Sequence, residues 1–122
     1  MLEMLLGGAA STWVARRVAT ATHGLHAPEL LDLEVAQVLR RLEREKTISA
    51  ARGKRALDDY LDLHVVRYAH RPFLNRVWAL RANATAYDAV YLALAEGLDA
   101  PLVTLDQRLA RSAGHRARVH AP

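Results

Sequence analysis

The segment from Ala86 to Gly97 constrains the fold of this chain more than any other. It is apolar on nearly every side, with Val90, Leu92 and Leu94 set among alanines. A helix of that composition has no face suited to water, so other elements must cover it all round. We therefore expect a buried helix over 86–97, closed by Gly97 as its C-terminal cap, inside a layered fold.

Helical and strand patterns alternate along the rest of the chain. Apolar residues at helical spacing predict helices over 29–45, over 49–63 with Ser49 as N-cap, over 72–83, and a short one from Gln107. Apolar runs rich in β-branched residues predict strands at 64–68, 101–105 and 116–120. This alternation predicts an α/β fold with a central parallel sheet between two layers of helices, and ligands at the carboxyl ends of its strands.

Length and composition limit the class of protein. The 122 residues suit a single domain spanning 1–122, without repeat or linker. The chain has no cysteine, which excludes disulfides, thiolate zinc sites, iron–sulfur clusters and cysteine nucleophiles. The first ten residues carry Glu3 and lack a leading basic region, and no apolar run is long enough to cross a bilayer. We expect a cytoplasmic protein that does not enter a membrane.

The charge is moderately basic. Seventeen basic residues against thirteen acidic ones give a net charge of +4, and fifteen of the seventeen are arginine, which suits phosphate recognition. A GC-rich genome would give the same composition without selection for nucleic acid. Five arginines are candidate phosphate contacts, although a solvated face explains them equally well: Arg16, Arg17, Arg40, Arg41 and Arg44.

Asp88 lies in the first turn of the predicted buried helix, where an ionised carboxylate needs compensation. One interpretation is a capping box with Thr85 as N-cap, which would stabilise the helix by about 1 kcal/mol. The other is a functional carboxylate. Asp106 poses the same choice, because it follows the predicted strand 101–105 and is also well placed as the N-cap of the next helix.

Glu34 lies beside the apolar stripe of the helix 29–45, about 60 to 70 degrees from its centre. It is either a boundary glutamate paired with an arginine or a third functional acid. Clustered carboxylates repel one another, and a divalent cation removes that repulsion. Mg2+ prefers such oxygen ligands and serves phosphodiester hydrolysis without a protein nucleophile.

Other site chemistries find little support in the residues. The six histidines form no helical zinc-binding pair, and Gly7-Gly8 lacks the Lys-Ser/Thr that follows a phosphate-binding loop. A DNA-binding helical protein would need an exposed recognition helix, for which only the stretch around Arg52 to Arg55 is a candidate.

Three segments together resemble a PIN domain, and more narrowly the VapC-type toxins of bacterial toxin–antitoxin pairs. They are His26-Ala27-Pro28-Glu29-Leu30-Leu31-Asp32-Leu33-Glu34-Val35-Ala36, Ala86-Tyr87-Asp88-Ala89-Val90-Tyr91-Leu92-Ala93-Leu94-Ala95 and Leu102-Val103-Thr104-Leu105-Asp106. The resemblance covers the chain from about Leu2 to Val119, and the middle segment is the most specific.

The resemblance implies a Mg2+- or Mn2+-dependent ribonuclease with acidic residues at the carboxyl edge of a central parallel sheet. By position in the matching segments, the metal-site acids are Glu34, Asp88 and Asp106. Thr104 matches a small hydroxyl residue that orients a ligand or water. The resemblance also implies an RNA substrate, a VapB-like antitoxin whose helix lies in an apolar groove, and a homodimer.

The chain departs from the family pattern at its beginning. Family members start with a strand that ends in an Asp-Ala-Ser-like turn, and Glu3 looks like a glutamate that follows this turn. The first strand and first acid would then lie upstream of Met1. A misassigned start codon, which we favour, a degenerate toxin and a strand supplied by a partner each explain this.

Two functions from different classes follow from these observations. The first is a metal-dependent endoribonuclease of the VapC type, the toxin of a type II system. The second is a PIN-like binding module that pairs with an antitoxin without cleaving RNA, and the missing first acid favours it.

Overall fold

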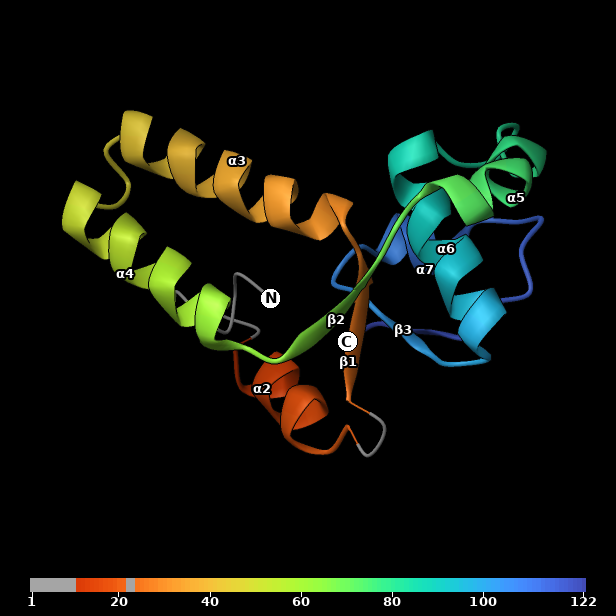
Figure 1. Ribbon diagram of the computed structural model, residues 1–122, viewed down its shortest axis with the longest axis horizontal. Helices are drawn as coiled ribbons and strands as arrows, with labels where there is room; N and C mark the ends of the chain where they lie inside the picture. The colour runs from red at the N-terminus through yellow and green to blue at the C-terminus, as the bar shows by residue number, and fades with distance from the viewer. Residues whose placement is uncertain (1–10, 22–23) are drawn as a thin grey trace. The chain divides into compact units, whose positions relative to one another are not determined.

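The computed structural model describes residues 11–21 and 24–122 and divides into two compact units, residues 1–66 and 67–122 (Figure 1). The first unit holds α2 (Ser11–Ala19), β1 (Leu25–Pro28), α3 (Leu30–Arg44) and α4 (Ala50–Asp62), and β2 (Val65–Tyr68) crosses the boundary. The second holds the 3-10 helix η1 (Arg71–Phe73), α5 (Leu74–Ala79), α6 (Ala86–Leu98), β3 (Leu102–Val103), α7 (Gln107–Arg111) and β4 (Val119–His120).

The predictions made for Glu3, for Gly7-Gly8 and for the rest of Met1 to Ala10 lie outside the described residues. That residues 1–122 form a single domain stays a prediction. In the part of the chain that the structure describes, no helix is both long and apolar enough to cross a membrane.

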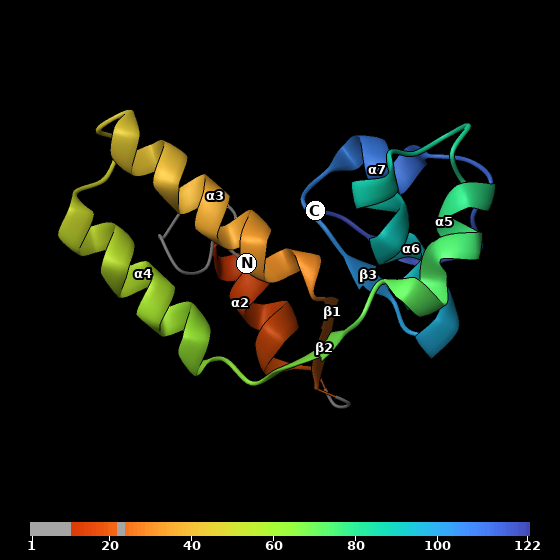
Figure 2. The same cartoon turned by 45° about the horizontal axis from the view of Figure 1, so that its top comes forward.

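The two long helices of the first unit, predicted over 29–45 and 49–63, form a helical hairpin and lie side by side in both ribbon views (Figure 2). Val35 and Leu39 of α3 meet Ala56 and Tyr60 of α4 in a small apolar core. Ser49 caps α4 as predicted, because its hydroxyl accepts the Arg52 N–H at 3.0 Å.

The helical spacing of 49–63 predicts that Leu57 and Leu61 face inward, and this prediction is wrong for Leu61. Leu61 is 62% exposed, because Ala56 and Tyr60 define the inward face of α4 and Leu61 lies about 100 degrees round the helix from Tyr60. The Tyr60 hydroxyl donates a 2.6 Å hydrogen bond to Asp32 of α3, so the polar tip of the most buried aromatic side chain is satisfied.

Helix α6 is the buried element of the second unit, as its sequence predicts. Six of its residues are buried: Ala89, Val90, Leu92, Ala93, Leu94 and Ala95. Helix α5 packs against α6 and contributes Val77 to the core, and Leu80, directly after α5, is buried as well (Figure 2). The apolar surface of α6 is therefore covered by elements from its own unit.

Gly97 does not cap α6, which corrects the sequence prediction. The helix continues to Leu98 and ends at Asp99, which adopts the left-handed conformation (φ 47°, ψ 45°). Gly97 serves packing instead, because an added Cβ would lie 3.2 Å from Cε1 of Phe73.

The predicted helix 72–83 is shorter than expected. The chain forms η1 and the six-residue α5, and then passes through turns closed by hydrogen bonds from Asn83 and Ala84 to the Leu80 carbonyl. Thr85 is extended as the N-cap of α6, so the backbone must leave helical geometry before it. Trp78, read as part of the apolar pattern, is 68% exposed.

The strands form two pairs, β1 with β2 and β3 with β4. Strands β3 and β4 are parallel, with Leu102 opposite Val119 and Val103 opposite His120. Parallel neighbours separated by a helix are the signature of an α/β chain, which is the predicted class. Both strands are shorter than the predicted 101–105 and 116–120.

An ion pair joins three segments of the second unit. Arg76 of α5 donates two hydrogen bonds to Glu96 of α6, at 2.7 Å to Oε1 and 3.0 Å to Oε2. The Arg116 N–H also donates to Glu96 Oε2, at 2.6 Å, which draws the backbone away from the strand ladder. The Arg76 hydrogen bonds, opposed by burial and helped by the Arg116 N–H, hold the pKa of Glu96 at about 2.

We predict that Glu96→Gln lowers the free energy of unfolding by about 2 kcal/mol at pH 7, because Arg76 loses its charged partner and, with its side chain 32% exposed, regains only part of that interaction from water. The folded pKa of Glu96 lies below its ordinary 4.5, so its contribution is complete above pH 4.5 and is lost as pH falls toward 2. The variant should therefore approach the wild type at low pH. Urea unfolding at pH 7 and pH 3 measures this difference.

The control is Asp58→Asn, which breaks an exposed pair with Lys54 on α4 and should change stability by less than about 0.5 kcal/mol. An equal loss in both variants at pH 7 would contradict the structural role of Glu96.

Candidate functional site

Asp88 lies in the first turn of α6 and is half-buried. The hydroxyl of Thr85 accepts the Asp88 N–H at 3.2 Å, which confirms Thr85 as the N-cap. Only this half of the predicted capping box is formed. The Asp88 carboxylate makes no hydrogen bond or ion pair with another residue of the described ranges. Its oxygens therefore remain available to a ligand, next to the positive end of the helix dipole.

Asp106 is the N-cap of α7, as the alternative interpretation predicted. Its Oδ1 accepts the N–H groups of Arg108 at 2.8 Å and Leu109 at 3.3 Å. Arg108 Nε lies 3.6 Å from the same oxygen. Within residues 11–21 and 24–122, Oδ2 has no such partner. The capping and ligand-binding roles are thus compatible, because they use different oxygens.

The pKa of Asp106 is lowered. Burial opposes ionisation, but the N–H hydrogen bonds of Leu109 and Arg108, together with the charge of Arg108, outweigh it. Asp106 is therefore a carboxylate at neutral pH, which is the form that binds a cation.

Thr104 supports the turn that leads into Asp106. Its Oγ1 accepts the Asp106 N–H at 3.0 Å, and its own N–H donates to the His120 carbonyl of β4 at 3.0 Å. The residue is half-buried, at the end of β3. Its hydroxyl proton stays free to donate, as orienting a water or a phosphate oxygen would require.

Glu34 is half-buried on α3, on the margin of the apolar stripe, as predicted. It belongs to the first unit, and it already takes part in an interaction with another residue. Asp88 and Asp106 belong to the second unit. The described residues contain no group of three or more acidic or histidine side chains placed to hold a metal ion. The metal-site assignment of Glu34, Asp88 and Asp106 therefore stays a prediction.

The donor chemistry of the second unit nevertheless fits a hard cation. Asp88 and Asp106 each offer carboxylate oxygen without a partner among the described residues, and both are half-buried at helix N-termini. Mg2+ and Mn2+ bind such oxygens and complete their coordination with water or phosphate.

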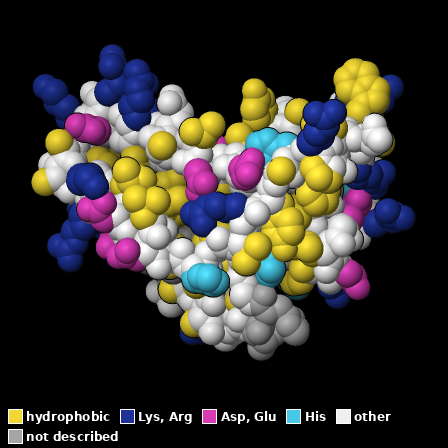
Figure 3. Space-filling view, in the orientation of Figure 1, with side chains coloured by type: hydrophobic (Ala, Val, Ile, Leu, Met, Phe, Trp, Pro, Cys, Tyr) yellow, Lys and Arg dark blue, Asp and Glu magenta, His cyan; other side chains and the backbone are white. Residues whose placement is uncertain are grey.

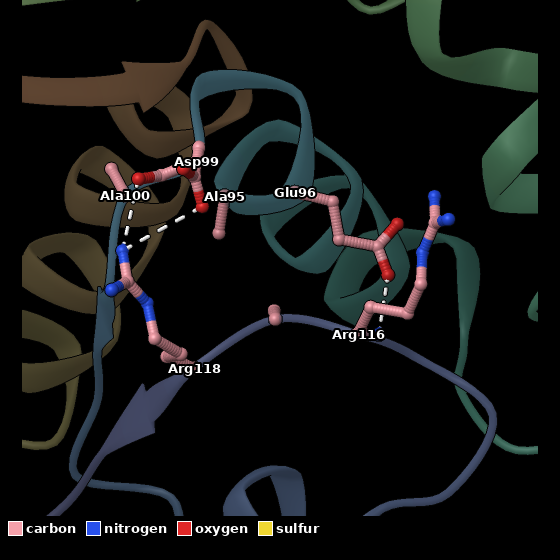
Figure 4. A pocket seen from close by; sticks show the side chains of 7 residues that line it. Ala95, Glu96, Asp99, Ala100, Arg116 and Arg118 are labelled. Carbon is pink, nitrogen blue, oxygen red and sulfur yellow. Dashed lines mark hydrogen bonds and ion pairs between the residues drawn. The ribbon is translucent and has the colours of Figure 1, made fainter.

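A pocket of about 300 Å³ lies at the other end of α6 (Figure 4). Two of its charged side chains, Glu96 and Arg118, already have hydrogen-bond partners in the pocket wall. Glu96 accepts the Arg116 N–H, and Arg118 donates to the Asp99 carbonyl at 2.9 Å. Its lining begins at Ala95, about 10 Å along the helix from Asp88, so it is not part of the candidate site.

The sequence reasoning overlooked the Arg76–Glu96 pair, although a signal existed. Glu96 is an acid within a helix that is otherwise almost entirely apolar, and such a residue requires a partner.

The amino-acid sequence matches the PIN domain family over residues 1–114. This chain belongs to that family.

Several characterised relatives are similar over most of their length. The chain is 47% identical to VapC ribonuclease Mb0985 of Mycobacterium bovis over 93 residues, which cover 76% of this chain and 73% of the relative. It is 40% identical to Ribonuclease VapC12 of Mycobacterium tuberculosis over 118 residues, covering 97% and 90%. It is 42% identical to Ribonuclease VapC1 of the same species over 115 residues, covering 93% and 86%.

We predict that the capping role of Asp106 can be separated from its charge. Without metal, Asp106→Ala should lower the free energy of unfolding by about 1 kcal/mol, because two N–H groups of α7 lose their acceptor. Asp106→Asn should stay close to the wild type, since its amide oxygen still accepts both bonds. Urea unfolding in chelator makes the comparison, and equal stability of Asp106→Ala and wild type would refute the capping role.

Proposed function

We propose that this chain is a metal-dependent endoribonuclease of the VapC type, the toxin of a type II toxin–antitoxin system. The main support is a pair of half-buried acids, Asp88 and Asp106, which lie at the starts of two helices shortly after Thr85 and Thr104. Each has a carboxylate oxygen without a partner among the described residues. The PIN family match and the ribonuclease relatives support the same function.

The proposed metal ligands are Glu34, Asp88 and Asp106. When bound, Mg2+ or Mn2+ supplies an activated water and neutralises charge on the scissile phosphodiester. Asp88 would help to hold the cation, and Asp106 would do so while its Oδ1 keeps the N–H groups at the start of α7 satisfied.

Thr104 has a positioning role in this proposal. By accepting the Asp106 N–H it fixes the backbone that carries the carboxylate. Its hydroxyl proton would donate to a water or to a phosphate oxygen of the substrate. RNA suits the basic surface, where Arg16, Arg17, Arg40, Arg41 and Arg44 are exposed for phosphate contacts.

The partners proposed with this function are the RNA substrate, a VapB-like antitoxin and a second copy of the toxin. An apolar groove would receive the antitoxin helix, with a basic side chain approaching the acids. The proposed place of action is the cytoplasm, where cellular RNA is present.

We predict that Asp88→Asn abolishes cleavage of a structured RNA in Mn2+ and leaves the fold intact. The amide removes the charge that holds the cation, while the Thr85 cap depends on the backbone N–H and is kept. Gel analysis of the RNA, with Mn2+ and with chelator, measures cleavage, and circular dichroism checks folding.

Asp59→Asn is the matched control, because Asp59 is an exposed carboxylate on α4. It should cleave RNA like the wild type. Full cleavage by folded Asp88→Asn would rule out the proposed site.

A binding module that pairs with an antitoxin without cleaving RNA is the second candidate. A folded wild-type protein that binds the antitoxin but cuts no RNA in Mn2+ would establish this function instead.

A further inference from the structure

Trp78 is the most exposed aromatic side chain of the described residues, although its sequence pattern favours the core. It is 68% exposed on α5, where its neighbour Val77 is buried. Figure 3 shows hydrophobic side chains at the surface over α5, with basic side chains beside them. An exposed indole of this kind is suited to a ligand contact.

The guanidinium group of Arg81 stacks on the indole ring of Trp78. The guanidinium carbon of Arg81 lies 4.5 Å from the centroid of the Trp78 ring, within the range of a cation–π interaction. Arg81 Nη1 also donates a 2.9 Å hydrogen bond to the Trp78 carbonyl, which fixes the guanidinium over the ring. Most of the ring nevertheless stays open to solvent.

The surrounding sequence has a single sign of charge. From Arg67 to Tyr87 the chain contains four arginines and no acidic residue. Arg76 is committed to Glu96, whereas Arg71 and Arg81 are exposed. This acid-free segment leads directly to Asp88, ten residues after Trp78, and its helix α5 packs against α6.

We propose that Trp78, with Arg81 stacked on it, is a platform for a base of single-stranded RNA and positions the strand for the site at Asp88. This inference rests on the proposed function. Bases of single strands expose flat faces that stack on aromatic rings, while a positive surface follows the phosphates. A protein partner is the other outcome that the test below distinguishes, because Trp and Arg are also enriched at protein interfaces.

The test follows the single remaining indole of a full-length Trp13→Phe protein, in chelator to prevent cleavage. A labelled oligoribonucleotide of about ten nucleotides is the probe. It should quench Trp78 fluorescence to saturation, at the concentrations where its own anisotropy rises. An abasic strand of equal length and charge should bind more weakly and leave the indole fluorescence unchanged.

Trp78→Ala should weaken RNA binding roughly 10- to 100-fold and raise KM more than it lowers kcat. Trp78→Tyr should restore most of the affinity, because it restores a stacking ring. Leu74→Ala is the matched control, since Leu74 is an exposed apolar residue one turn earlier on α5 and should leave RNA binding unchanged.

The possible failures are distinguishable. If the wild type cleaves RNA and Trp78→Ala keeps its KM and affinity, the platform is refuted while the ribonuclease function stands. If Trp78→Ala and Leu74→Ala instead both dissociate a dimer in sedimentation, with RNA binding unchanged, the surface is a protein interface and the platform is again refuted. If the wild type neither binds nor cleaves RNA, both proposals fail.

Discussion

The burial of α6 is the constraint on which the second unit depends. A helix that is apolar all round cannot face water, so α5 packs against it with Val77 buried, and Leu80, directly after α5, is buried as well. Burial also dictates where its charges can lie. Asp88 sits in the first turn, where the helix dipole favours a negative charge, and Glu96 near the other end is neutralised by Arg76. The same helix therefore carries a structural acid and an uncommitted one.

Glu96 has a structural role, whereas Asp88 is available to bind a ligand. Glu96 accepts three hydrogen bonds, and its pKa of about 2 reflects the stability it provides. The Asp88 carboxylate has no such partner among the described residues. Only the backbone N–H of Asp88 takes part in the Thr85 cap, so the carboxylate itself adds little to the stability of the fold. Asp106 lies between these cases, with one oxygen capping α7 and the other uncommitted. A divalent cation would make use of both uncommitted groups.

Much of the fold could be predicted from local patterns. The helices α3, α4 and α6 and the caps at Ser49, Thr85 and Asp106 depend on spacing and on single side chains, which the sequence displays directly. Long-range pairing could not be predicted. Gly97 resembled a helix end because nothing in the sequence reveals its close approach to Phe73. The predicted strand 116–120 is shorter because the Arg116 N–H donates to Glu96 and not to a neighbouring strand. The assembly of Glu34 with the two aspartates is equally non-local, and it stays a prediction.

Whether Asp88 holds a divalent cation can be measured by the binding of Mn2+. Electron paramagnetic resonance measures free Mn2+ as the full-length protein is added, without requiring any knowledge of the RNA target. We expect saturable binding of about one ion per chain, which is lost in Asp88→Asn and kept in Asp59→Asn. Equal binding by the wild type and by a folded Asp88→Asn would contradict it, and so would a folded wild type that binds no Mn2+.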